Sequence, residues 1–125
     1  MGKKALSFRR LLKSFGYALR GIRMLISEEQ NARVHLFIFC CVVIAGLALH
    51  LSPTEWIVVV IVSGNVFAAE AVNSSIEELS DAVSPERNPK IKLVKDLAAG
   101  AVLLTAIAAA ITGLIIFVPK IVALF

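Results

Sequence analysis

Charged side chains are scarce in this sequence. Lys, Arg, Asp and Glu make up 18% of the 125 residues, whereas hydrophobic residues make up 58%. A water-soluble domain of this length would expose much of that apolar surface, so the composition excludes a soluble globular protein. Because a lipid bilayer accepts apolar side chains, the composition predicts a single integral membrane domain that covers residues 1–125.

Cysteine is also rare, and the two that occur, Cys40 and Cys41, are adjacent within an apolar run. Neighbouring residues of a helix point to different sides and rarely form a disulfide, and the pair lacks the spacing of a metal site. We therefore expect two buried, free thiols that take no part in chemistry.

Acidic residues are missing from the first 23 positions. A basic arm of this kind can bind nucleic acid. However, apolar side chains recur at helical spacing over residues 8–26, and an apolar stretch follows directly. This pattern predicts a cytoplasmic amphipathic helix within residues 1–28 that lies in the membrane interface, and no nucleic-acid partner. Its cationic side consists of Lys3, Lys4, Arg9, Arg10, Lys13, Arg20 and Arg23.

Three apolar stretches follow, and we expect transmembrane helices over residues 34–51, 56–83 and 97–118. The first is about as short as a helix can be and still cross the roughly 30 Å hydrocarbon core. The second crosses only if the helix continues unbroken through the polar string that begins at Glu70. We expect Pro119 to end the third, and a polar loop over residues 84–96. The predicted fold is an all-α membrane bundle of three spans preceded by a surface helix.

Basic residues predict the orientation of these spans. They gather in the amino-terminal segment and in the 84–96 loop, whereas the short turn at residues 52–55 has none. The positive-inside rule then places the amino terminus and the second loop in the cytoplasm and the carboxyl terminus outside. Lys120, at the other end of the third span, is the one exception.

Polar side chains form one stripe on the second span. At 100° per residue they share a sector about 100° wide. Glu70 then lies inside the hydrocarbon near its cytoplasmic side, where a carboxylate costs on the order of 2–3 kcal/mol. Glu77 lies two turns farther on, at the boundary. The stripe contains Glu70, Asn73, Ser74, Glu77 and Asp81.

Charged groups from other segments are expected at the same level, among them Glu29 before the first span and Lys95 and Asp96 before the third. Carboxylates there can hold a hydrated Mg²⁺, while Lys and Arg bind polyphosphate. The partly desolvated Glu70 suits a general base for a lipid hydroxyl. The set therefore predicts phosphoryl transfer from a water-soluble donor to a membrane-soluble acceptor.

Simpler interpretations remain open for each residue taken alone. Glu70 could pair with a Lys or Arg of a neighbouring helix, and Asn73 could be an interhelical hydrogen-bond partner. Glu77 and Asp81 could be ordinary interface charges. We expect His35 to cap or pack rather than to bind a metal, because no second ligand stands at helical spacing.

The string Glu70-Ala71-Val72-Asn73-Ser74-Ser75-Ile76-Glu77-Glu78-Leu79-Ser80-Asp81 resembles the signature of the prokaryotic diacylglycerol kinase family. That signature is E-x-hydrophobic-N-[ST]-[SA]-hydrophobic-E-x-x-[VS]-D, and every specified position fits. The resemblance extends over nearly the whole chain. As in that family, the sequence has neither a P-loop nor the glycine-rich loop of protein kinases.

The resemblance implies a homotrimeric kinase of the bacterial inner membrane, with composite active sites that use ATP and Mg²⁺. Glu70 would be the catalytic base, supported by Asn73 and Asp81. Glu29 and Glu77 would hold the metal. The implied nucleotide contacts are Arg10, Tyr17, Glu29, Glu77, Glu86, Arg87, Asn88, Lys95 and Asp96, and the implied lipid contacts are Arg10, Arg23, Asn31, Trp56 and Glu70.

The first expectation for the acceptor is diacylglycerol, which would give phosphatidic acid. The segments 29–35 and 84–89, however, resemble the branch that includes undecaprenol kinases, so undecaprenol is the rival acceptor. Two hypotheses from other classes are a holin-like non-enzymatic protein and a small proton-coupled transporter. Neither explains why the polar row continues from the hydrocarbon out to the cytoplasmic surface.

Overall fold

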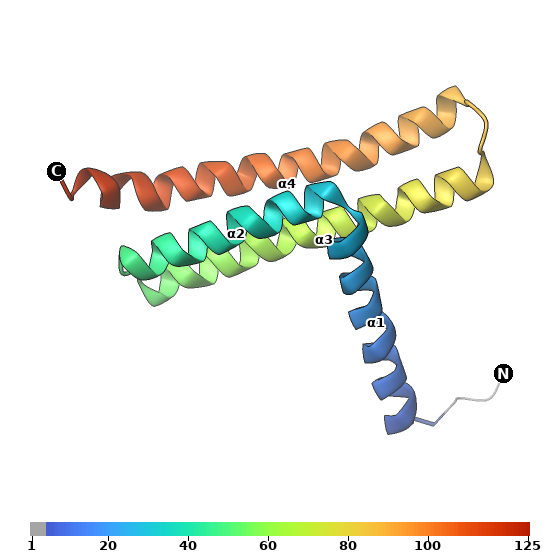
Figure 1. Cartoon of the computed structure of the whole chain (residues 1–125), viewed down its shortest axis with the longest axis horizontal. Coiled ribbons are helices and arrows are strands. Elements are labelled where there is room, and N and C mark those ends of the chain that lie inside the picture. Colours follow the sequence, from blue (N-terminus) through green and yellow to red (C-terminus); the bar gives the residue numbers. More distant parts are fainter. Residues whose placement is uncertain (1–4) are drawn as a thin grey trace.

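The computed structural model describes residues 5–125, which form four helices: α1 (Phe8–Glu28), α2 (Gln30–Ala48), α3 (Pro53–Val83) and α4 (Pro89–Val122). Helices α2, α3 and α4 run lengthwise beside one another, and α1 projects crosswise from them (Figure 1). Helix α3 packs against both α2 and α4, whereas α2 and α4 do not approach each other closely. The predicted all-α fold is confirmed.

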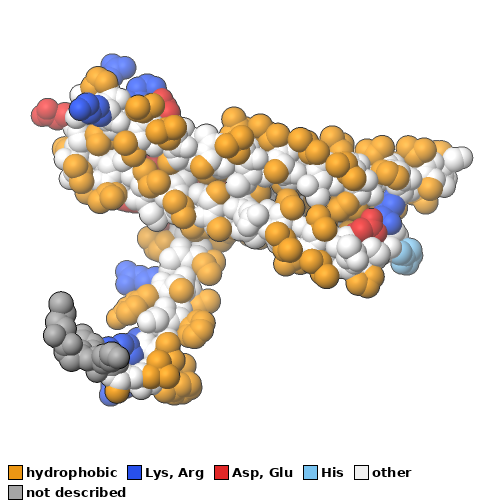
Figure 2. Space-filling model, turned by 180° about the vertical axis from the view of Figure 1, so that it is seen from behind, with side chains coloured by type: hydrophobic (Ala, Val, Ile, Leu, Met, Phe, Trp, Pro, Cys, Tyr) orange, Lys and Arg blue, Asp and Glu red, His pale blue; other side chains and the backbone are white. Residues whose placement is uncertain are grey.

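Three of the helices, α2, α3 and α4, are long and apolar enough to cross a membrane. Figure 2 shows hydrophobic side chains over the long face of the bundle, with charged groups gathered near its ends. This distribution suits a bundle whose middle lies in hydrocarbon. The chain is therefore a multi-pass membrane protein, as the sequence predicted. Lys3 and Lys4, which we assigned to the interfacial segment, lie outside the described residues.

Helix α3 passes without interruption through its polar string, as predicted. Its start is fixed by a capping box. The Ser52 N–H donates to Glu55 Oε1 (2.9 Å), and the Glu55 N–H donates to Ser52 Oγ (3.2 Å). Pro53 occupies the first turn, where its missing N–H costs nothing. A fixed start determines how deep along the helix each later side chain lies.

The predicted boundaries of α4 are wrong at both ends. The loop expected over residues 84–96 ends at Asn88, whose Oδ1 accepts a hydrogen bond from the Lys90 N–H (2.9 Å) and caps the helix. Pro89 follows at the first helical position, which favours a helix start. At the other end, the helix continues past Pro119 to Val122. A proline removes only one backbone hydrogen bond, and so close to a helix end few others depend on it.

Lys120, the one basic residue at the end of the third span that we predict to lie outside, forms an ion pair. Lys120 Nζ lies 3.1 Å from Glu55 Oε1, and each side chain is about a quarter exposed (27% and 26%). The pair joins the end of α4 to the start of α3. Lys120 is a single basic residue against the larger number in the amino-terminal segment and the α3–α4 connection, so it carries little weight in the Lys and Arg count.

Cys40 and Cys41 are free, as expected, but both are exposed on the surface of this chain. The prediction that they are buried is wrong. Helix α2 packs on α3 alone among the other spans, so most of its circumference stays uncovered.

Close packing of Trp56 on Gly46 joins α2 to α3 near the short turn. The turn itself follows a left-handed His50 (φ 56°), and the Leu51 N–H donates to the Gly46 carbonyl (3.1 Å). A Cβ at position 46 would lie 2.6 Å from Trp56 Cη2 and 2.9 Å from Leu51 Cδ1. Only glycine admits this approach of the indole ring.

We expect Gly46→Ala to displace Trp56 and to lower stability by about 1–3 kcal/mol, the usual cost of overpacking. Since Trp56 is the only tryptophan of the chain, its fluorescence emission in micelles reports the displacement, and thermal unfolding reports the stability. Gly64→Ala is the matched control, because nothing lies within 4 Å of the added methyl group. Identical emission spectra and unfolding curves for the two variants would contradict the packing described.

Candidate active site

The polar stripe of α3 turns from buried to exposed along the helix. Glu70 is 2% exposed and Asn73 is 8% exposed. Ser74 and Glu77 are half-buried, and Asp81 is exposed. The first residues of the stripe therefore point inward, toward the neighbouring helices, and the last one lies at the surface.

Three buried atoms of this stripe, Glu70 Oε1, Asn73 Oδ1 and Ser74 Oγ, have no hydrogen-bond partner within residues 5–125. Buried polar groups in native proteins are nearly always hydrogen-bonded. Three such atoms within little more than one helical turn indicate a place where a ligand or another chain supplies the missing partners.

Glu70 meets a histidine of the neighbouring helix. His35 Nε2 of α2 lies 3.3 Å from Glu70 Oε1, within ion-pair distance but without the geometry of a hydrogen bond. No Lys or Arg among the described residues pairs with Glu70. The simpler interpretation, in which Glu70 pairs with a neighbouring Lys or Arg, is therefore not what this chain shows.

This contact was not predicted, because His35 was expected to cap or pack. The feature of the sequence that could have indicated this contact is a titratable side chain inside the first apolar stretch. Helical periodicity orders residues within one helix, but it does not show which face of α2 meets which face of α3.

Ion pairs occupy the end of the bundle beyond Glu77. Lys95 Nζ donates to Asp81 Oδ1 (2.6 Å) and joins α4 to α3. Lys95 precedes the apolar part of α4. One turn away, Lys92 Nζ donates to Asp96 Oδ2 (2.7 Å). The structure thus places Lys95, Asp96 and Asp81 at one end of the bundle, beside the exposed loop that contains Glu86, Arg87 and Asn88.

A cleft of about 670 Å³ lies between α1 and α3, and its lining includes Glu29 and, from the polar stripe of α3, Ser74. Glu29 and Glu77 are both close enough to Glu70 to act on it electrostatically. In the part of the chain that the structure describes, no three acidic, histidine or cysteine side chains gather into a metal site. The carboxylates of Glu29 and Glu77 nevertheless suit Mg²⁺. This ion binds one or two carboxylates of a protein and completes its coordination shell with phosphate oxygens and water.

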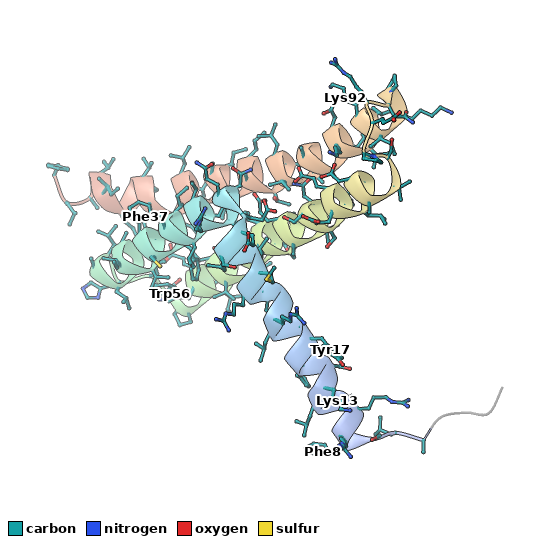
Figure 3. All side chains as sticks on the ribbon, turned by 45° about the vertical axis from the view of Figure 1, so that its right-hand side comes forward. Phe8, Lys13, Tyr17, Phe37, Trp56 and Lys92 are labelled. Carbon is teal, nitrogen blue, oxygen red and sulfur yellow. The ribbon has the colours of Figure 1, made fainter. Side chains whose placement is uncertain are left out.

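Other residues of the predicted site are not brought to Glu70 by this chain. Tyr17 lies on the part of α1 that projects away from the spans (Figure 3) and is 71% exposed. Arg10, seven residues earlier on the same helix, is also exposed. Arg23 and Asn31 are exposed as well. Trp56 packs at the opposite end of α3, more than three helical turns from Glu70.

An apolar cavity of about 300 Å³ lies over α3, between α2 and α4. Its walls are mostly Val, Ile, Phe and Ala side chains, and His35 is its one titratable lining residue. Since His35 also contacts Glu70, the cavity has a polar end beside the buried carboxylate. A hydrophobic cavity with one such end suits a molecule that has an apolar chain and a polar head.

These features define a class: a helical membrane protein with a buried acidic site at one end of its spans. The family model described as prokaryotic diacylglycerol kinase matches residues 16–117. The chain belongs to the prokaryotic diacylglycerol kinase family. It is accordingly an enzyme, a lipid phosphotransferase, as the signature on α3 predicted.

Similar proteins are named for two different lipid acceptors. The chain is 39% identical over 111 residues to "Undecaprenol kinase" of Bacillus subtilis, covering 89% of this chain and 90% of that protein. It is 36% identical over 115 residues to "Diacylglycerol kinase" of Synechocystis, covering 91% of this chain and 66% of that protein. A "Diacylglycerol kinase" of Helicobacter pylori is 34% identical over 103 residues, covering 81% and 79%.

Proposed function

We propose that the protein transfers the γ-phosphoryl group of Mg-ATP to the primary hydroxyl of a membrane lipid, and that undecaprenol is its physiological acceptor. The observation that carries the proposal is the buried Glu70 carboxylate, whose Oε1 has no hydrogen-bond partner in the described residues and which contacts His35 in the wall of the apolar cavity. A lipid whose chain lies in hydrocarbon can present its hydroxyl to such a group, whereas a water-soluble acceptor would have to leave water to reach it.

The order of acceptors differs from the one expected at first, which placed diacylglycerol before undecaprenol. Segments 29–35 and 84–89 already pointed to the undecaprenol branch. The similarity to an undecaprenol kinase over 90% of that protein's length supports the same choice. Diacylglycerol, which would yield phosphatidic acid, is the second candidate, because two of the relatives named above are diacylglycerol kinases.

In the proposed reaction Glu70 accepts the proton of the lipid hydroxyl while its oxygen attacks the γ-phosphorus. The new O–P bond forms as the bond from that phosphorus to the departing ADP oxygen breaks. Glu29 and Glu77 would hold Mg²⁺, which neutralises charge on the phosphates when bound. Lys95, at the exposed end of the bundle, is within the region where the nucleotide would bind.

A homotrimer is part of the proposal. Tyr17, a predicted nucleotide contact, lies on the part of α1 that projects away from the spans (Figure 3), and Arg10 lies seven residues nearer to the start of that helix. A neighbouring copy could supply them to this site, which would then be composite. The three unpartnered atoms of the α3 stripe are consistent with such an addition.

We further propose that the protein lies in the bacterial cytoplasmic membrane with the amino terminus and the α3–α4 loop in the cytoplasm. Helix α1 projects crosswise from the spans (Figure 1), so it would follow the membrane surface. Its arginines and lysines would then meet lipid phosphates. This orientation gives the acidic end of the bundle access to cytoplasmic ATP.

The acceptor is tested with the purified oligomer in mixed micelles that contain Mg-ATP and one lipid at a time. We expect kcat/KM for undecaprenol to exceed that for diacylglycerol by at least about tenfold, the discrimination that small differences in a hydrophobic site provide. Mass spectrometry identifies each phosphorylated product. A larger kcat/KM for diacylglycerol would restore the original order, and no transfer to either lipid by folded oligomer would refute the kinase proposal.

A further inference from the structure

The contact between α2 and α3 at Glu70 goes beyond the family signature, because the signature lies on α3 alone. Glu70 is the most buried charged side chain of the described residues, at 2% exposure. The side chain of His35 is 24% exposed, so most of its ring is covered. A carboxylate in this position needs a partner to hold one rotamer, and its own helix offers none.

We propose that His35 is a positioning residue that orients the Glu70 carboxylate toward the acceptor hydroxyl. This inference rests on the proposed function. His35 acts through Glu70 and is not itself assigned a contact with the reacting atoms. Its Nε2 faces Glu70 Oε1 at 3.3 Å, which leaves Oε2 to meet the hydroxyl.

A pair of aromatic rings fixes the register of the two helices at this point. The rings of Phe39 and Phe67 meet edge to face, with centroids 6.2 Å apart and planes at 89°. Phe39 lies four residues after His35 on α2, and Phe67 lies three residues before Glu70 on α3. Residues at these spacings share a helix face. The aromatic pair therefore holds His35 and Glu70 opposite each other.

The other charged groups near this pair are acidic. Glu29 and Glu77 are the neighbouring carboxylates that act electrostatically on Glu70. Within residues 5–125 no other basic side chain pairs with Glu70, and His35 is the one titratable residue in the wall of the apolar cavity. Among the described residues, His35 is thus the one basic side chain that is both at ion-pair distance from Glu70 and in the wall of the apolar cavity.

The inference is tested with two variants. His35→Leu replaces the imidazole by an apolar side chain of similar reach, and His35→Gln retains an N–H donor. We expect His35→Leu to lower kcat by about 10–100-fold, the usual cost of losing a group that orients an active-site residue. KM for ATP should not change, because His35 is not among the residues proposed to bind the nucleotide. His35→Gln should recover most of the lost kcat.

A double variant tests whether His35 acts on kcat through Glu70. In a Glu70→Gln background, His35→Leu should cause no further loss of kcat, because the group that it positions is already gone. The control is His50→Asn, at the exposed turn that follows α2, where asparagine tolerates the left-handed backbone (φ 56°). It should keep wild-type kcat. Wild-type kcat in His35→Leu, with an active parent enzyme, would overturn the inference but not the proposed function.

A second measurement does not depend on activity or on the folding of His35→Leu. The chain has two histidines, so ¹⁵N-labelled imidazoles give two sets of signals, and His50→Asn identifies those of His50. We expect Glu70→Gln to shift the His35 signals and to leave those of His50 unchanged. Unchanged His35 signals would show that the two side chains do not interact, whatever the reaction.

Discussion

Replacing Glu70 by Gln should remove lipid phosphorylation and leave nucleotide binding nearly intact. Gln has almost the same shape as Glu but does not accept the proton of the lipid hydroxyl. A general base contributes about 10²–10⁴-fold to a rate, so we expect a loss of kcat in that range. Initial rates at saturating Mg-ATP and lipid measure the loss, and titration with a non-hydrolysable ATP analogue measures binding.

The matched control is Glu55→Gln, a carboxylate at the opposite end of the same helix, where Gln can still accept the Ser52 N–H of the capping box. It carries the same change in charge and should retain wild-type kcat. If Glu70→Gln turned over at the wild-type rate, Glu70 would not be the base. If it lost turnover only because it lost nucleotide binding, the separation of the two roles along α3 would be wrong.

The second large effect is expected for Glu77→Gln, which should raise the Mg²⁺ concentration needed for half-maximal activity. Glu77 is half-buried two helical turns after Glu70, near the exposed end of the bundle. Losing a residue that merely supports a metal ligand costs about 10–100-fold in affinity or activity, so losing a direct ligand should shift the titration by at least about tenfold.

This effect is measured as rate against free Mg²⁺ at saturating ATP, with Glu55→Gln again as the control. A metal ligand predicts that excess Mg²⁺ restores much of the rate. The same variant should not resemble Glu70→Gln, in which added metal restores nothing. A Mg²⁺ titration that coincides with that of the wild type would argue that Glu77 does not bind the metal.

Much of the fold follows from local rules, and for that reason the sequence predicted it. Hydropathy and length identified the three spans. The capping box at residues 52–55, which starts α3 at Pro53 rather than at the predicted residue 56, was not predicted. Once α3 was expected to continue through Glu70, the 100° period placed Glu70 and Asn73 on one face. The structure shows both buried on that face.

The features that the sequence missed depend on pairing between helices. His35 meets Glu70 because of the way α2 packs on α3, which no period within one helix reveals. The ion pairs of Lys95 with Asp81 and of Lys120 with Glu55 join residues that are distant along the chain. The start of α4 was missed for a different reason: the polar composition of residues 89–96 resembled a loop, although Asn88 and Pro89 are good residues for a helix start.

In the proposed reaction, α3 serves two substrates at two depths along its length. Glu70, buried beside an apolar cavity, would serve a lipid hydroxyl. Glu77, with Glu29, would serve the metal of a soluble nucleotide. Neither role alone would require a row of polar side chains that runs from the buried part of a span to its exposed end.

The most direct test asks whether the two substrates meet at this site. Mn²⁺, which accepts the same oxygen ligands as Mg²⁺, is bound together with a non-hydrolysable ATP analogue. The acceptor lipid carries ¹³C at its hydroxyl-bearing carbon, and solid-state NMR records the paramagnetic broadening of that signal. We expect strong broadening in the wild-type protein and its loss in Glu77→Gln at low Mn²⁺. A sharp ¹³C signal while Mn²⁺ and nucleotide are both bound would contradict the account.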